Sequence, residues 1–350
     1  DYQLEPREIY VDGDRLIVIG SSHRYLSPVD PDAPARIPFR DSDVSIMPIM
    51  PVAPEAGVKT LVYDIADRSS PKLLKEVQVD GHYLNSRKIG DYVYVISNQY
   101  LDTYRIMNGE WAPEGGPAVY DSAISTEPEA IGFDRIHYFP DGPHQSYLTI
   151  STIDTAQPDQ PADHKVYLGT AENVYASTDH LYIALTKYEL PEVKLDGADP
   201  DQMSNKLIRP YPVAERSTIV HKFKLEEGSV QYVAQGEVPG SVLNQFSMDE
   251  HNGYFRIATT KGEVWRTDEH TSTNNVYILD ETMNIAGKLE NIAPGERIYS
   301  VRFMGNRGYM VTFKKVDPLF VLDLADPYNP SILGKLKIPG YSDYLHPYDE

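Results

Sequence analysis

The stretch VYDIADRSSPKLLKEVQVDG at residues 62–81 returns without a gap as VLDLADPYNPSILGKLKIPG at residues 321–340. In each copy an apolar strand ends in an Asp-containing turn, a proline closes the turn, and a second strand runs on to a glycine. Such turn residues between two apolar runs are typical of antiparallel strand pairs. A strand pair that returns this far along the chain indicates equivalent β units built on one plan. We expect Asp67 and Asp326 to accept backbone hydrogen bonds in the same kind of turn.

A second pattern recurs along the whole chain: an inner strand, a tight polar turn and a strongly apolar strand. Each turn carries Gly, Asp or Asn, the residues that tolerate positive φ. Two further strands follow each hairpin, which gives four antiparallel strands per unit and predicts an all-β fold, a β-propeller. A β-sandwich or several small all-β domains are the alternatives, and the recurring strand order favours the propeller. The hairpins span residues 8–19, 85–96, 174–184, 244–258 and 300–313.

The expected β-propeller of four-stranded antiparallel blades is a single domain over residues 1–350. Aligning the two copies places Glu350 opposite Asp91, so we expect the chain to stop within a further blade. Five complete blades and a partial one are therefore expected. The complete blades should span residues 7–81, 82–170, 171–240, 241–295 and 296–340, with the first strand of the next blade at residues 341–350.

The composition narrows the classes of partner. With 350 residues, of which 41% are hydrophobic, the chain can bury a large core. The net charge of −20 and the pI near 4.9 argue against nucleic acid and against an anionic membrane surface as partners. No apolar run approaches the length of a membrane span, so we expect no membrane insertion within this chain. The lack of cysteine fits exported and cytosolic proteins alike.

Several longer motifs resemble those of a known family. They are GERIYSVRFMG at residues 295–305 with VTF at 311–313 and DPLF at 317–320, NQFSM at 244–248 with RIATT at 256–260, and YLHPY at 344–348. The chain resembles a family of secreted bacterial and archaeal proteins whose β-propeller domain is distantly related to WD40 repeats. The resemblance covers essentially the whole chain. It implies a secreted or cell-surface location and a full ring of seven or eight blades, but no established activity. Some members carry a domain similar to the N-terminal domain of copper amine oxidases, and no copper site is matched here.

The clearest functional clue is where the blades are lengthened. The first four blades carry insertions between their second and third strands, whereas the fifth has only a short connection at residues 314–318. Because strand direction alternates, these connections should all emerge on one face of the propeller. Long loops on a rigid repeat scaffold usually carry binding, although capping of the blades is an alternative role. The insertions span residues 21–58, 98–146, 186–217 and 260–274.

Tyrosines in these insertions would supply rigid, amphipathic contact area for a partner. They are Tyr100, Tyr104, Tyr188 and Tyr211. The sequence therefore predicts an extracellular or cell-surface binding scaffold that recognises a protein or polysaccharide through a face rich in loops. The alternative is a propeller-fold hydrolase or lyase that acts on an extracellular polymer.

A second candidate site lies on the innermost strands. Arg87 and Arg302 stand at equivalent positions of their hairpins, and His346 aligns with them in the repeat register. Three basic side chains that converge on the central channel would form an anion site, since Arg offers bidentate donors to carboxylate or phosphate. The alternative, which we favour, is that each Arg pairs with a neighbouring carboxylate such as Asp64, Asp317 or Asp323 and holds the blades together.

The sequence carries no catalytic signature, so no catalytic residue is assigned. It contains no GxSxG, HExxH, Gly-rich phosphate loop or Cys nucleophile, and its ten histidines are scattered. We therefore favour binding over catalysis without settling whether the chain is an enzyme. Carboxylate-rich loops at residues 30–32, 41–43 and 196–201 offer the oxygen ligands that Ca²⁺ prefers. None has EF-hand spacing, so no cofactor is predicted. Calcium binding by these loops is kept as an alternative.

Overall fold

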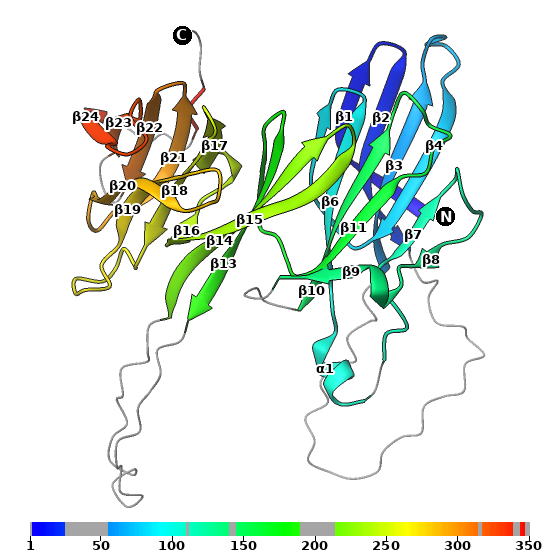
Figure 1. The fold of residues 1–350 in the computed structure, drawn as a ribbon, viewed down its shortest axis with the longest axis horizontal. Coiled ribbons are helices and arrows are strands. Elements are labelled where there is room, and N and C mark those ends of the chain that lie inside the picture. The colour runs from blue at the N-terminus through cyan, green and yellow to red at the C-terminus, as the bar shows by residue number, and fades with distance from the viewer. Residues whose placement is uncertain are drawn as a thin grey trace, which may run out of the picture. The chain divides into compact units, whose positions relative to one another are not determined.

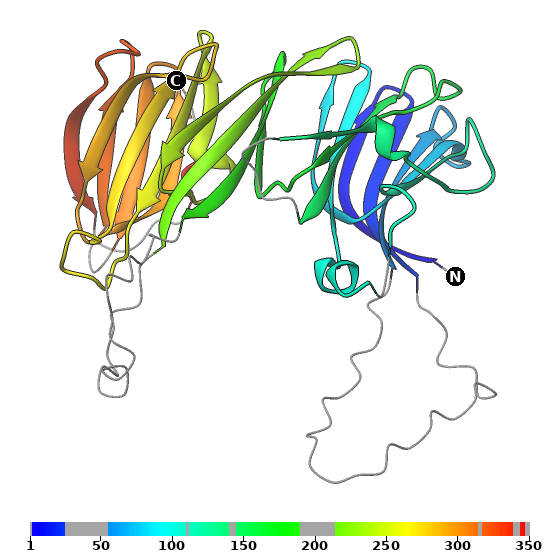
Figure 2. The same ribbon diagram turned by 60° about the horizontal axis from the view of Figure 1, so that its bottom comes forward.

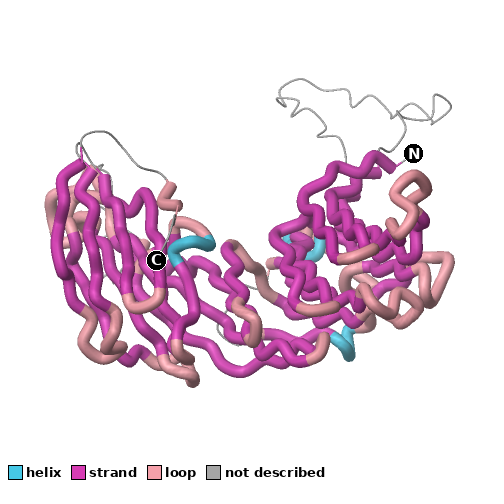
Figure 3. Tube along the Cα trace, turned by 90° about the horizontal axis from the view of Figure 1, so that it is seen from above, coloured by secondary structure: helices cyan, strands magenta, loops and turns pink. Residues whose placement is uncertain are grey.

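The computed structural model describes residues 2–24, 55–109, 112–139, 145–189, 214–313, 317–338 and 344–346. These residues form five sheets, and most of their strands are labelled in Figure 1. The helical segments among them are short (Figure 3), and none is long and apolar enough to span a bilayer. They are α1 (Thr103–Met107), η1 (Phe133–Arg135) and η3 (Gln245–Ser247). The predicted all-β fold of repeated antiparallel blades is confirmed.

The chain divides into two compact units. Unit 1 consists of Asp1–Pro140 and His144–Thr170, and unit 2 consists of Asp141–Pro143 and Ala171–Glu350. Unit 1 holds the sheets of the first two predicted blades, and unit 2 holds the other three. A single domain with a ring of seven or eight blades stays a prediction.

Unit 1 contains two sheets. The first runs in the order β1-β2-β3-β4-β7-β8, and the second in the order β5-β6-β10-β11-β9. The strands of the first are β1 (Tyr2–Asp12), β2 (Arg15–Arg24), β3 (Glu55–Asp64), β4 (Lys72–Asp80), β7 (Ala118–Asp121) and β8 (Glu129–Ala130). Those of the second are β5 (His82–Ile89), β6 (Tyr92–Tyr100), β10 (Ser146–Asp154), β11 (Asp163–Leu168) and β9 (Ile136–Tyr138).

The insertion of the second blade takes a route that its sequence does not predict. β7 pairs with β4 of the first sheet, from Val77↔Asp121 to Val79↔Val119, and β9 pairs in parallel with β11. Part of this insertion therefore follows the outer edges of both sheets instead of standing on one face. Residues 118–130 join the first blade, although we assigned them to the second. The physical reason is that an outer strand exposes unpaired backbone groups, which a neighbouring strand satisfies.

Unit 2 contains three sheets. The third sheet of the chain has β12 (Asn173–Ala176), β13 (His180–Glu189), β14 (Glu215–Glu226) and β15 (Ser229–Pro239). The fourth has β16 (Ser241–Val242), β17 (Met248–His251), β18 (Tyr254–Lys261), β19 (Thr273–Leu279) and β20 (Ile285–Ile292), with η3 between the two pieces of its inner strand. The fifth has β21 (Arg297–Met304), β22 (Arg307–Phe313), β23 (Asp317–Asp323) and β24 (Ser331–Ile338).

The hydrophobic cores lie between neighbouring sheets of each unit. Middle strands are buried on successive residues, as at residues 146–153, so both faces of these sheets are covered. In unit 1, Val62 of the first sheet and Ile153 of the second belong to one cluster. In unit 2, Tyr182 of the third sheet stacks on Phe255 of the fourth with ring centroids 4.2 Å apart. The fourth and fifth sheets, yellow to red in Figure 2, share a further cluster.

The turns of the repeated stretch are built as predicted. Asp67 accepts the backbone N–H of Ser69 at 3.0 Å, and Asp326 accepts that of Tyr328 at 2.9 Å. Side-chain hydrogen bonds, from Ser69 to Asp67 and from Asn329 to Asp326, are the main reason why the pKa of each carboxyl lies below its usual value. The two copies therefore share a turn structure as well as a sequence pattern.

A buried ion pair joins both sheets of unit 1 to the rerouted insertion. Lys75 on β4 lies 2.8 Å from Asp121 at the end of β7, and their side chains are 1% and 3% exposed. Lys75 also donates to the carbonyls of Pro158 and Gln160, in the turn between β10 and β11. Asp121 accepts the backbone N–H of Ala162 from the same turn. One pair of opposite charges thus connects three segments that are distant in sequence.

Replacing Lys75 by Met should lower the free energy of unfolding by about 3–5 kcal/mol, because Asp121 then stays buried without its counter-charge. Chemical denaturation measures the change. Adding Asp121→Asn to Lys75→Met should recover part of the loss, since the amide oxygen still accepts backbone N–H groups. A Lys75→Met variant as stable as the parent would contradict this account.

Burial of His164 makes the stability of unit 1 depend on pH. Burial is the main reason why the pKa of His164 falls from 6.5 to about 4, and its Nδ1 lies 2.9 Å from the hydroxyl of Ser151. Below pH 6.5 the unfolded chain binds a proton at this side chain that the folded chain does not bind. The contribution of neutral His164 to the free energy of unfolding is therefore complete above pH 6.5, and it is lost as the pH falls toward about 4.

The free energy of unfolding should decrease between pH 6.5 and about pH 4, and His164→Gln should make this decrease smaller. Urea titrations at several pH values in this interval measure both slopes. Buried His221 of unit 2, whose pKa also falls to about 4, should leave the variant with a residual slope. Equal slopes for the parent and the variant would refute the role of His164.

Candidate functional site

The predicted residues of the inner strands share one register position. Arg87 on β5 and Arg302 on β21 each stand three residues before the first turn residue, Gly90 or Gly305. In the other sheets this position is held by Tyr10, Tyr175 and Asp249. The structure therefore allows the role of this position to be compared from blade to blade.

In two blades a tyrosine at this position reaches the next sheet. The hydroxyl of Tyr10 lies 3.0 Å from that of Ser86 on β5. The hydroxyl of Tyr175 is hydrogen-bonded to the backbone N–H of Glu250 on β17. Both contacts hold the inner strand of one blade against the inner strand of its neighbour.

In the fourth blade a buried ion pair makes the contact with the neighbouring blade. Asp249 accepts two hydrogen bonds from Arg256, its cross-strand partner, at 2.7 and 2.5 Å. The Arg256 guanidinium is 2% exposed and donates to the carbonyl of Gly305 at 2.6 Å, in the turn of the fifth blade. It also lies 5.1 Å from the ring centroid of Phe303. A bidentate pair thus links the fourth blade to the fifth.

Arg302 and His346 both contact the hydroxyl of Tyr344. The Arg302 guanidinium lies 4.4 Å from the Phe246 ring centroid and 5.6 Å from that of Tyr344, and its Nε donates to the carbonyl of Leu345. The Tyr344 hydroxyl lies 3.3 Å from Arg302 Nη2 and 3.3 Å from His346 Nδ1. Arg302 therefore continues the blade-to-blade pattern toward the segment that follows the fifth blade.

Two of the carboxylates proposed to pair with these arginines have other partners. Asp64 lies 3.7 Å from Arg15, and Asp323 lies 3.2 Å from Arg307. Arg302 contacts aromatic rings and a backbone carbonyl, and the side chain of Asp317 lies outside the described residues. Arg87 belongs to unit 1, and an anion site shared by all three basic side chains stays a prediction.

The predicted tyrosines among the described residues are distributed over both units. Tyr100 packs beside His82 in unit 1, with ring centroids 5.9 Å apart, and Tyr104 is exposed on α1. Tyr188 is exposed near the end of β13 in unit 2, where the Arg216 guanidinium lies 5.9 Å from its ring centroid. Tyr211 lies outside the described residues, as do the carboxylate-rich loops considered for calcium.

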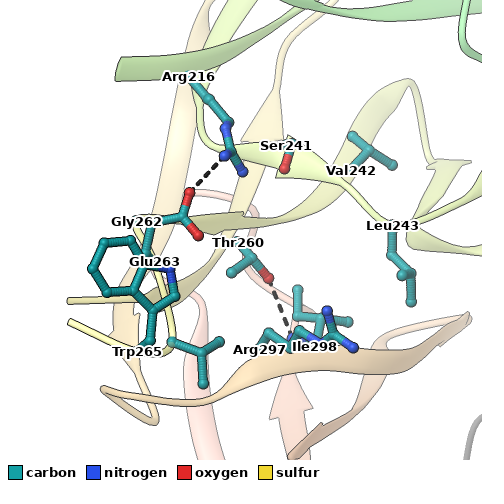
Figure 4. Close-up of a pocket in the computed structure, with 11 residues that line it drawn as sticks. Arg216, Ser241, Val242, Leu243, Thr260, Gly262, Glu263, Trp265, Arg297 and Ile298 are labelled. Atoms are coloured by element: carbon teal, nitrogen blue, oxygen red, sulfur yellow. Dashed lines mark hydrogen bonds and ion pairs between the residues drawn. The ribbon is translucent and has the colours of Figure 1, made fainter. Parts of the chain in front are cut away.

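A cavity of about 340 Å³ opens beside Arg216, and we call it the unit 2 pocket (Figure 4). It lies where the ends of β14 and β18, the short β16, the start of β21 and the loop after β18 meet. The residues used below are Arg216, Ser241, Leu243, Glu263, Trp265 and Arg297. Sequence reasoning missed this pocket, although Trp265 lies within the predicted insertion at residues 260–274.

The loop that carries Trp265 is folded tightly on itself. Gly262 opens it with φ of +79°, and a Cβ there would lie 2.6 Å from the carbonyl oxygen of His270. Glu263 donates its backbone N–H to the same carbonyl and accepts the backbone N–H of Ser272. Only glycine fits this close approach, which closes the loop at its base.

The stem of this loop is fastened to the fifth blade. Buried Asn274 donates to the carbonyls of Ile292 and Glu296, at 3.1 and 3.3 Å. Thr260 donates to Asn274 Oδ1 at 2.9 Å. It also accepts the backbone N–H of Ile298 at 3.2 Å, a bond drawn in Figure 4. These bonds fix the floor of the pocket before any ligand arrives, so binding would cost little ordering.

The pocket presents a paired and an unpaired guanidinium together with an exposed indole. Arg216 and Glu263 form an ion pair at 2.5 Å. Arg297 donates to the hydroxyl of Tyr299 at 3.1 Å, and within the described ranges it makes no ion pair. Trp265 is 75% exposed and Leu243 is 45% exposed. The arrangement can hold an anion at Arg297 while apolar surface packs on the indole.

A second cavity of about 320 Å³, beside Lys261 and Glu269, is also lined by Arg216 and Glu263. The ion pair therefore contributes to two hollows of unit 2. In the part of the chain that the structure describes, no group of three or more His, Cys, Asp or Glu residues could hold a metal ion.

The chain belongs to the β-propeller domain family, whose model matches residues 1–350. An uncharacterised protein of Methanocaldococcus jannaschii is 58% identical over 115 residues, which are 33% of this chain and 18% of that protein. An uncharacterised protein of Archaeoglobus fulgidus is 50% identical over 133 residues, which are 37% of this chain and 20% of that protein. The match spans about a fifth of the length of each relative.

Solved structures of related shape are distant. A chimera of apocarotenoid oxygenase and RPE65 has a TM-score of 0.38 at 11% identity, covering 98% of this chain and 64% of that one. A mutant of the Synechocystis apocarotenoid oxygenase has a TM-score of 0.36 at 10% identity, covering 94% of this chain and 60% of that one. Similarity at this level says nothing about activity.

Replacing Arg302 by Met should lower the free energy of unfolding by about 1–2 kcal/mol, because it removes a cation–π contact and two hydrogen bonds. Denaturant titration measures the change. Arg307→Met is the matched control, since this arginine of the same hairpin makes a partly exposed ion pair as its one side-chain interaction among the described residues, worth about 0–1 kcal/mol. Equal effects of the two substitutions would contradict the blade-linking role of Arg302.

Proposed function

We propose that this chain is a binding module that recognises a macromolecular or polymeric partner, protein or polysaccharide, through the unit 2 pocket. One observation carries the proposal: a rigid hollow exposes an indole and a guanidinium that makes no ion pair within the described residues. Exposed aromatic and arginine side chains are the residue types that most often dominate binding energy. A preformed floor adds affinity because little is left to be ordered.

An extracellular or cell-surface location is part of this proposal. It is supported by the resemblance of the sequence motifs to secreted propeller proteins. The strongly acidic composition fits a chain that stays in solution and does not bind nucleic acid. The partner would then be a component of the cell envelope or its surroundings.

A propeller-fold hydrolase or lyase is the competing function. Paired carboxylates about 5–10 Å apart would be expected in such an enzyme. The described lining of the unit 2 pocket contains one carboxylate, Glu263, and Arg216 holds it in an ion pair. This geometry suits the recognition of a ligand better than proton transfer to one, so we propose binding.

Trp265→Ala should weaken binding of the polymers that the parent chain captures by at least about tenfold, because it removes the largest exposed surface of the pocket. An array of neutral polysaccharides, acidic polysaccharides and peptides, followed by titration of the captured polymers, measures the change. Phe133→Ala is the control, since Phe133 is an exposed aromatic residue of unit 1. A parent that captures no polymer, or a Trp265→Ala variant that retains them all, would refute the proposal.

A further inference from the structure

We propose that the unit 2 pocket binds an acidic sugar residue of a polysaccharide, with the sugar ring on Trp265 and its carboxylate on Arg297. The inference rests on the proposed binding function and adds the chemical class of the ligand. A hexuronate is the simplest residue of this kind: a hydroxylated ring with one carboxylate. The cavity of about 340 Å³ is large enough for such a residue and part of its neighbour.

The indole of Trp265 is a flat contact surface with one cationic side chain packed near it. The guanidinium of Arg266 lies 5.3 Å from the Trp265 ring centroid, and Asp268 holds it there through an ion pair. The indole nevertheless stays 75% exposed, so a large part of its surface is open to a ligand. The C–H face of a sugar ring is flat and apolar, and packing it on an indole removes apolar surface from water.

Arg297 is oriented to receive a carboxylate. Its Nη2 donates to the hydroxyl of Tyr299 at 3.1 Å, and the guanidinium lies 5.0 Å from the centroid of that ring. Tyr299 is supported by Phe313, with ring centroids 5.0 Å apart. The tyrosine thus restrains the guanidinium without neutralising it. A guanidinium held in this way retains N–H donors for a bidentate carboxylate.

The remaining polar groups favour a sugar over an acidic peptide. Glu263 uses one carboxylate oxygen for Arg216, and its second oxygen can accept a hydroxyl hydrogen. The Ser241 hydroxyl lines the same hollow and makes no hydrogen bond among the described residues. Sugar hydroxyls satisfy both groups, because they donate and accept. The ionised side chains of an aspartate or glutamate run only accept hydrogen bonds, so they could not donate to the free oxygen of Glu263.

The charge of the whole chain limits how such a polymer can bind. A net charge of −20 repels a polyanion, but salt screens this repulsion beyond about 8 Å at physiological ionic strength. Attraction must therefore be local, at Arg297 and the surface around it. Affinity should consequently depend strongly on this one charge.

The test compares three polymers: polygalacturonate, its highly methyl-esterified form and poly-L-glutamate. Esterification removes the charge and keeps the ring and its hydroxyls. The parent chain should bind polygalacturonate at least about tenfold more tightly than either other polymer. Arg297→Gln should remove this preference for the acid over the ester, and Trp265→Ala should weaken binding of both sugar polymers. Arg307→Gln, an exposed arginine on β22 of the same sheet, should bind like the parent.

Each other outcome has a defined meaning. No binding of polygalacturonate by the parent overturns the inference, and so does a preference for acid that survives Arg297→Gln. Equal or tighter binding of poly-L-glutamate through Arg297 would show an acidic peptide site instead. Tight binding of a neutral polymer that depends on Trp265 but not on Arg297 would refute the sugar acid and leave the proposed binding function intact.

Discussion

The middle strands of these sheets are buried on both faces, and this constraint shapes the rest of the structure. Middle strands such as β10 are buried residue after residue, so a single sheet in water would expose the apolar surface that its neighbours cover. Neighbouring sheets must therefore pack face to face. Hydrogen bonds and ion pairs at one register position then fix how the inner strands of neighbouring sheets contact each other. The kind of contact differs from blade to blade: it is a hydrogen bond between the hydroxyls of Tyr10 and Ser86 in one blade, and the buried Arg256–Asp249 ion pair in another.

The difference between contacts within a hairpin and contacts between blades explains what the sequence could and could not predict. Hairpins and their Asp-containing turns depend on residues close together in the chain, so alternation of apolar residues and turn chemistry were enough to find them. The equivalence of Asp67 and Asp326 was visible for that reason. Arg302 and His346 were found through the repeat register, which reports equivalent positions; it does not report the ring of Phe246 packed beneath Arg302.

The features that sequence reasoning missed all depend on contacts between distant segments. β7 is four residues long, and its pairing with β4 follows from an open sheet edge rather than from its own composition. The unit 2 pocket draws Arg216 from β14, Arg297 from β21 and Trp265 from the loop after β18. A single sequence offers no periodicity that would connect these residues. Only the packing of the third, fourth and fifth blades makes them neighbours.

The route of the second insertion also has a consequence for the order of assembly. β4 receives its outer neighbour β7 only after β5, β6 and α1 have been made, so the first blade is still incomplete when the second has begun. During synthesis the nascent first sheet must wait with an open edge and with Lys75 lacking its counter-charge. The two blades of unit 1 are thus interleaved along the chain, and no single cut between them yields two intact halves.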